Sequence, residues 1–246
     1  MEADRPGGTR EFGEFELADE SVVYLDQGKF KQAEQVAEQA VSIFHEEGAR
    51  RGEGWTMRAL GDIARKQHQL SEARSYYSEA AAIFTTLGNR VDLARVINSL
   101  AAISFAEGEP LTAKEHYEHA LAIAQEQGTL QIKGRALRGL GDVMRALHQN
   151  GEAERTYQEA LNIAVELDTP AERCASLHRL GHLYSDQQRY TQALEAWMQA
   201  LAHDRRIGHV ERADLRAKID RLVAEQHLES TYQELCQQQG LDVRIG

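Results

Sequence analysis

The chain has 246 residues, 42% of them hydrophobic, and a formal net charge of −11 with histidine counted as neutral. This negative balance argues against a general nucleic-acid binder, because neutralising phosphates requires a net basic surface. The sequence also holds two cysteines and no run approaching about 18 consecutive apolar residues, which argues against a disulfide framework and a membrane-spanning helix and predicts a cytoplasmic protein.

The start of the chain lacks the apolar core of a signal peptide. We interpret residues 1–12 as a flexible leader. Residues 13–212 are predicted to form five repeats of 40 residues, and residues 213–246 a C-terminal capping pair of helices.

The five repeats are defined by residue types that recur at a fixed step of 40 positions. A constant period of roughly 20 to 50 residues is typical of solenoid proteins, in which each unit packs only on its neighbours. The recurring positions are Ala33, Ala73, Ala113, Ala153 and Ala193; Ala40, Ala80, Ala120, Ala160 and Ala200; and Leu60, Leu100, Leu140 and Leu180.

Each repeat contains two amphipathic segments, and the fourth copy shows them at residues 133–148 and 151–167. Apolar residues recur there at steps of three, four and seven, which predicts helices. A short polar turn joins the two segments, so the helices must be antiparallel neighbours. Alanines and glycines at the contacts allow close approach of the helix axes. Glycines after the second helix are predicted to form left-handed caps, at Gly48, Gly88, Gly128 and Gly208.

The two ends of the array are predicted to act as caps. Glu20 stands where later repeats have leucine, which indicates a solvated terminal helix. Beyond the fifth repeat, a helix pair that has lost the repeat pattern is predicted from Leu215, Ile219, Leu222, Val223, Leu228, Tyr232 and Leu235. Solenoids need polar-faced ends of this kind for solubility.

The order leucine-glycine, alanine, aromatic, alanine, as in Leu60, Gly61, Ala73, Tyr77 and Ala80, resembles the tetratricopeptide repeat. The resemblance covers residues 17 to about 210 and implies an all-α, right-handed superhelical solenoid of antiparallel helix pairs. Its long unit resembles the variant in kinesin light chains, Pins-type scaffolds and the sensor arms of bacterial signal-transducing NTPases and transcriptional regulators. The fragment 136–142 looks most like the bacterial regulators.

The resemblance also implies a concave groove, lined by the face of each first helix beside its buried face. We call these residues the predicted groove face. Cations are numerous among them, whereas glutamates are numerous on the second helices, so the groove is expected to be locally basic. The candidates are Trp55, Arg58, Asp62, Arg65, Arg95, Asn98, Phe105, Arg135, Arg138, Asp142, Arg145, His178 and His182.

Two interpretations of this face stay open. The arginines and Asn98 can bind a peptide with acidic side chains or a carboxylate. Alternatively, the arginines and aspartates form inter-repeat ion pairs with a purely structural role. Trp55 and Phe105 are either peptide-contacting anchors or ordinary packing residues.

Three other kinds of site are disfavoured by the residues present. The chaperone-tail clamp of the family requires lysine and asparagine where this chain has Arg58, Asp62 and Ser99. Cys174, His178 and His182 share a helix face, but each step advances about 6 Å, so one ion cannot bind all three, and no metal site is expected. No phosphate-binding loop or nucleophile-base pair is visible, so no enzyme and no cofactor are predicted.

The leading hypothesis is therefore a non-catalytic protein-protein interaction module that binds a peptide or protein segment, as an adaptor or regulatory arm. A second hypothesis is an effector-sensing domain of a bacterial signalling or transcription protein. A third is a scaffold that self-assembles through exposed apolar residues between Leu215 and Leu235. A monomer is favoured, no membrane partner is expected, and the sequence does not name the partner.

Overall fold

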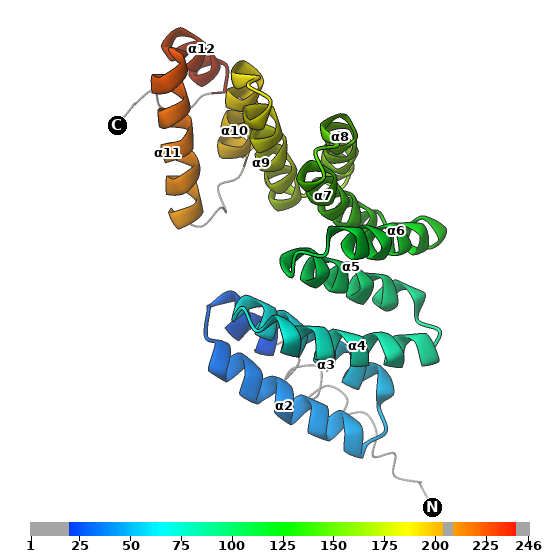
Figure 1. The fold of residues 1–246 in the computed structure, drawn as a ribbon. Helices are drawn as coiled ribbons and strands as arrows, with labels where there is room; N and C mark the ends of the chain where they lie inside the picture. Colours follow the sequence, from blue (N-terminus) through cyan, green and yellow to red (C-terminus); the bar gives the residue numbers. More distant parts are fainter. Residues whose placement is uncertain (1–19, 204–208, 240–246) are drawn as a thin grey trace, which may run out of the picture. The chain divides into compact units, whose positions relative to one another are not determined.

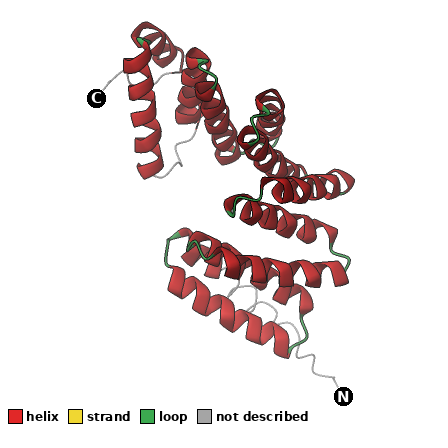
Figure 2. Cartoon of the chain, in the orientation of Figure 1, coloured by secondary structure: helices red, strands yellow, loops and turns green. Residues whose placement is uncertain are grey.

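The computed structural model describes residues 20–203 and 209–239, and all regular structure in these ranges is α-helical (Figure 2). This confirms the predicted all-α class. After a helical segment at residues 20–26, the helices are α2 (Phe30–Glu46), α3 (Arg50–Lys66), α4 (Leu70–Thr86), α5 (Arg90–Ala106), α6 (Pro110–Glu126), α7 (Leu130–Ala146), α8 (Asn150–Glu166), α9 (Pro170–Asp186), α10 (Tyr190–His203), α11 (His209–Gln226) and α12 (Glu229–Gln239) (Figure 1).

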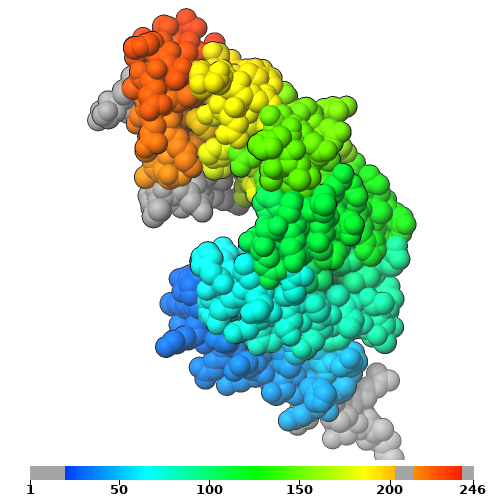
Figure 3. Space-filling view, viewed as in Figure 1, coloured from blue at the N-terminus to red at the C-terminus, as the bar shows by residue number. Residues whose placement is uncertain are grey.

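The chain divides into two compact units, Met1–Gln127 and Gly128–Gly246. The N-terminal unit holds α2 to α6, and the C-terminal unit holds α7 to α12. Within each unit, successive helices lie side by side and reverse direction at short turns (Figure 1). Within each unit, successive stretches of the chain pack directly against one another (Figure 3). The predicted leader lies outside the described residues, and the boundaries at residues 12 and 212 stay predictions.

The recurring alanines are the closest contact points between helices. All ten, from Ala33 to Ala200, have 0% of their surface exposed. The repeated glycines Gly61, Gly141 and Gly181 face aromatic rings of the following helix. A Cβ atom on Gly61 would lie 2.6 Å from Tyr77, and one on Gly141 would lie 2.5 Å from Tyr157. These glycines therefore make room for the tyrosines.

The helix ends show why glycine recurs after the second helix of each repeat. Gly48 has φ +67°, and its amide donates to the carbonyl of His45 at 3.1 Å while the Ala49 amide donates to Phe44 at 2.8 Å. This is the Schellman arrangement, which satisfies the last carbonyls of a helix. Gly88 and Gly128 also have positive φ, as predicted, whereas Gly208 lies outside the described residues.

The terminal helix pair α11 and α12 packs against α10 within the C-terminal unit (Figure 1). The apolar residues that the self-assembly hypothesis took as exposed are buried there, including Leu215 at 3%, Tyr232 at 1% and Leu235 at 7% exposure. They complete this unit's core with Trp197 and Met198. Leu228 is half-buried, so little apolar surface remains exposed at these residues to support self-assembly. Among the helices described, none is long and apolar enough to cross a membrane.

Candidate functional site

The predicted groove face is distributed over four first helices. Seven of its residues lie in the N-terminal unit, on α3 and α5, and six lie in the C-terminal unit, on α7 and α9. In both units most of these side chains contact another residue of the same unit.

Asp62 is the centre of a small network on α3. It accepts hydrogen bonds from the Arg58 guanidinium at 2.9 Å and from the Tyr77 hydroxyl at 2.7 Å, and Arg65 lies 3.8 Å away. Burial, followed by the charge of Asp62, raises the pKa of Tyr77, so this hydroxyl stays protonated and donates. Three predicted groove residues, Arg58, Asp62 and Arg65, are thus brought together, and the carboxylate is neutralised internally.

Trp55 contacts a carboxylate that the sequence interpretation missed. Its indole N–H donates to Asp92 at 2.8 Å, and Asp92 is only 5% exposed. Asn89, the residue that caps α5, donates to the same carboxylate at 2.7 Å, while its own oxygen accepts from the Asp92 amide at 3.2 Å. The sequence signal for this cap was an asparagine three positions before an acidic residue. Trp55 therefore connects α3 to α5, which favours the packing interpretation.

The remaining candidates of this unit lie on α5. Arg95 is the most exposed, at 47%, and its guanidinium lies 3.6 Å from Asp92. Asn98 is only 9% exposed, so little of its amide is within reach of a ligand. Phe105 is half-buried.

In the C-terminal unit, Arg135 and Arg138 converge on Glu172 at the start of α9. Arg138 forms a short ion pair with Glu172, and Arg135 lies 3.5 Å from the other oxygen. Arg138 is 13% exposed and Arg135 is 66% exposed. Burial lowers the pKa of Arg138, and the Glu172 charge opposes that effect. Glu172 was not among the predicted residues.

Asp142 pairs with Arg179, an arginine outside the predicted groove face. The Nε atom of Arg179 lies 3.0 and 2.9 Å from its two oxygens, and Tyr157 donates to it at 2.7 Å. Arg145 instead pairs with Asp186 at 2.9 Å. These contacts connect α7 with α9, the kind of inter-repeat ion pair expected under the structural interpretation.

His178 and His182 lie in edge contact on α9, with ring centroids 4.5 Å apart, and His182 also contacts Trp197. Burial lowers the pKa of His182 to about 4, and the charges of His178 and Lys218 add to this effect. His182 is therefore neutral at pH 7. In the described part of the chain no group of three or more His, Cys, Asp or Glu side chains is placed to hold a metal ion.

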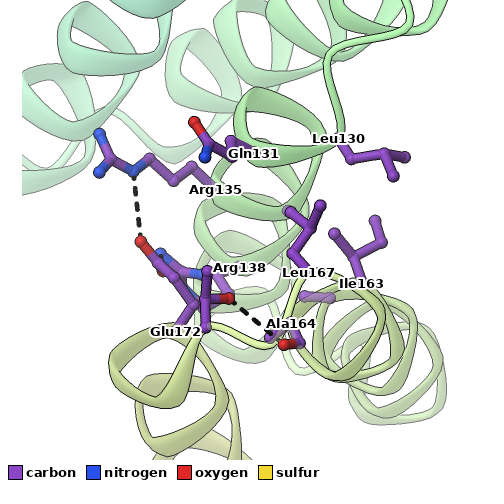
Figure 4. A pocket seen from close by; sticks show the side chains of 11 residues that line it. Leu130, Gln131, Arg135, Arg138, Ile163, Ala164, Leu167 and Glu172 are labelled. Atoms are coloured by element: carbon purple, nitrogen blue, oxygen red, sulfur yellow. Dashed lines mark hydrogen bonds and ion pairs between the residues drawn. The ribbon is translucent and has the colours of Figure 1, made fainter.

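A cavity of about 140 Å³ lies beside the two arginines of α7. Figure 4 shows Leu130, Ile163 and Leu167 together on one side of it, while Arg135, Arg138 and Glu172 lie on the other. The cavity thus combines an apolar wall with a charged rim, an arrangement suited to binding a ligand.

Comparisons with known proteins identify the repeat. A tetratricopeptide-repeat sequence profile matches residues 21–86 and 92–164, and a second profile of the same repeat matches residues 173–202. No significant match is found among curated proteins.

Solved structures share the fold at low sequence identity. BtubC (BKLC) from P. vanneervenii superposes with a TM-score of 0.69 at 19% identity, covering 86% of this chain and 89% of its own. Aspartyl phosphate phosphatase F from Bacillus subtilis gives 0.70 at 16% identity, covering 90% and 62%. A STAND protein with a tetratricopeptide-repeat sensor from Pyrococcus horikoshii gives 0.71 at 16% identity, covering 95% and 37%.

The first profile alone covers more than half of the chain, and the helix pairs described above are those of its repeat. The chain therefore belongs to the tetratricopeptide-repeat family, whose repeats are typically non-catalytic protein-interaction modules.

Proposed function

We propose that this chain is a non-catalytic interaction module that binds an acidic segment of a partner protein through arginines of its first helices. The family supports protein binding, and the charge of the predicted groove face supports an acidic ligand. Arginine is suited to this role because its planar fork binds a carboxylate through two hydrogen bonds.

The observation that carries the proposal is the exposure of Arg95 and Arg135 and their distance from neighbouring carboxylates. They occupy the same position in consecutive repeats and are the two most exposed arginines of the predicted face, at 47% and 66%. Their nearest carboxylates, Asp92 and Glu172, lie 3.6 and 3.5 Å away, too far for a strong hydrogen bond. Each guanidinium therefore keeps donors for a partner.

The other arginines are less suited to direct capture. Arg58 and Arg145 already donate to carboxylates at 2.9 Å, and Arg138 is 13% exposed. We assign them a positioning role, because Arg138 and Arg145 join α7 to α9 through their ion pairs and Arg58 pairs with Asp62 on its own helix.

The test is affinity capture from the cytosol of the source organism, with quantitative mass spectrometry, comparing the natural chain with Arg95→Glu/Arg135→Glu. The matched control is Lys31→Glu/Arg155→Glu, which changes the net charge equally at exposed positions of α2 and α8. A partner with an acidic segment should be lost with the first double variant and kept with the second. Equal capture by both variants would overturn the proposal.

A further inference from the structure

The cavity beside Arg135 has a structural origin in two small residues of its lining. Gly134 on α7 and Ala164 on α8 both line it. A Cβ atom on Gly134 would lie 3.4 Å from the nearest atom, a methyl of Ile163, which is ordinary contact with space remaining.

The same place in the N-terminal unit is filled. Gly54 and Phe84 stand 80 positions before Gly134 and Ala164, and a Cβ atom on Gly54 would lie 2.9 Å from the Phe84 ring. Phe84 is fully buried. The cavity of the C-terminal unit therefore corresponds to the phenyl ring that alanine lacks at position 164.

The size of the cavity agrees with this origin. A cavity of about 150 Å³ accommodates a benzene ring in a protein interior. At about 140 Å³, with Leu130, Ile163, Ala164 and Leu167 in its lining, this one can hold the side chain of a phenylalanine from another molecule.

The charged groups around the cavity favour an acidic residue next to that phenylalanine in the bound segment. Arg135 and Arg138 line the cavity with Glu172, and Arg179 and Asp142 pair nearby on the same helices. Three guanidinium groups thus face two carboxylates, which leaves one positive charge in excess. The exposed group among them is Arg135, at 66%.

We infer that the cavity between α7, α8 and the start of α9 is the anchor site for a partner segment in which a phenylalanine side chain stands beside an acidic residue. The aromatic ring occupies the space that Phe84 fills in the N-terminal unit, and the acidic side chain binds Arg135. This inference rests on the proposed function and specifies the ligand of one site within it.

The direct test is a titration with a terminally blocked pentapeptide, Gly-Glu-Phe-Glu-Gly, followed by NMR of the Ile163 methyl groups. Two control peptides replace both glutamates by glutamine or the phenylalanine by alanine. We expect saturable shifts with the first peptide, about tenfold weaker binding with the glutamine peptide, and no saturation with the alanine peptide. Equal binding of all three peptides would overturn the inference.

Variants of the chain test the two halves of the site separately. Ala164→Phe fills the cavity from within, as Phe84 does in its own unit, and should abolish peptide binding while the melting temperature holds or rises. Arg135→Gln should weaken binding about tenfold, whereas Arg155→Gln, at an exposed position of α8, should not change it. If Ala164→Phe disrupts the fold, Gly134→Leu fills the cavity from the opposite wall.

Ala164→Phe also separates this inference from the proposed function, because it keeps every charge. A partner lost with Arg95→Glu/Arg135→Glu but still captured by folded Ala164→Phe overturns the anchor site alone. A partner captured equally by all variants overturns the proposed function. A partner lost with both supports the anchor site.

Discussion

Helices α3 to α5 and α7 to α9 occupy corresponding places in the two units, yet their arginines choose different carboxylates. Asp62 and Asp142 stand at the same repeat position, and each accepts a hydrogen bond at 2.7 Å from its tyrosine. In the first region Asp62 binds Arg58 of its own helix, whereas in the second Asp142 binds Arg179 of the next repeat. Identical tyrosine-aspartate pairs are thus placed in different networks.

One substitution contributes to this difference. Ser99 occupies the position in the first region that Arg179 occupies in the second. A serine side chain is short and uncharged, so it cannot form an ion pair with Asp62. Asp62 instead pairs with Arg58 of its own helix. In the second region Arg179 satisfies Asp142, which leaves Arg138 to pair with Glu172. The repeat thus fixes the positions of the charged groups, and their neighbours determine which of them pair.

The largest expected effect removes the aromatic ring that distinguishes the two regions. Phe84→Ala should lower the free energy of unfolding by about 3 to 5 kcal/mol, because the ring is fully buried and packs on Gly54. Urea denaturation measures this. Ala164→Phe in the other region should cost little, since space exists there. A loss below about 1 kcal/mol for Phe84→Ala would mean that the ring is not the packing element inferred here.

A smaller effect is expected at the glycines that both regions share. Gly141→Ala should destabilise the chain by about 1 to 3 kcal/mol, because its Cβ atom would lie 2.5 Å from the Tyr157 ring. Gly134→Ala in the same helix is the matched control and should be neutral or stabilising by up to about 1 kcal/mol. Thermal unfolding measures the stability of both variants. Equal melting temperatures would contradict the expected difference.

A smaller loss of stability is expected when the network around Asp142 is converted into the one found around Asp62. Arg179→Ser reproduces the residue of the first region, and we expect a loss of about 1 to 2 kcal/mol. Arg138 should then turn from Glu172 to Asp142, as Arg58 binds Asp62. A double-mutant cycle of Arg138 and Glu172 measures this, since their coupling should fall in the Arg179→Ser background. An unchanged coupling would show that Ser99 is not the cause of the difference.

The smallest effect concerns an ion pair whose charges are reversed between the regions. Arg74 on α4 pairs with Glu107 and also lies 3.4 Å from Glu109, whereas at the positions that correspond to Arg74 and Glu109, Glu154 on α8 binds Arg189 at 2.6 Å. Glu154→Gln should lower stability at pH 7 by about 0.5 to 1 kcal/mol. The exchanged pair Glu154→Arg/Arg189→Glu, which gives these two positions the charges of Arg74 and Glu109, should restore most of it.

This last effect depends on pH with a defined sign. Hydrogen bonding to Arg189, then to Tyr184, lowers the pKa of Glu154 below its usual 4.5. The contribution of the folded-state carboxylate is therefore present above the unfolded pKa and is lost as the pH falls through the folded value. Stability measured at pH 7 and at pH 3 should differ more for the natural chain than for Glu154→Gln. Equal differences would contradict the assignment.

Much of the fold could be predicted because its determinants are local and periodic. The step of 40 residues, the alanines and the glycines that end helices are readable without knowing any partner residue. The predicted caps at Gly48, Gly88 and Gly128 adopt positive φ, and the same backbone geometry occurs at the non-glycine residues His68 and His148. Backbone spacing therefore imposes the left-handed residue even where its side chain is unfavourable.

The contacts within the candidate site could be predicted less well from the sequence. The period correctly placed Arg58 and Asp62 together, because residues four apart share a helix face. It missed Asp92, Glu172 and Arg179, since each belongs to a helix that arrives about 30 to 40 positions later and contacts the face only after packing.

Spacing along the chain is enough to specify an all-helical array, its period and the small residues at each helix contact. The packed structure is needed to see which arginine meets which carboxylate and which arginines stay exposed. It alone also showed that alanine at position 164 leaves a cavity where Phe84 fills the corresponding space. The physical reason is that charge pairing and free volume are properties of packed neighbours, and the repeat pattern does not contain them.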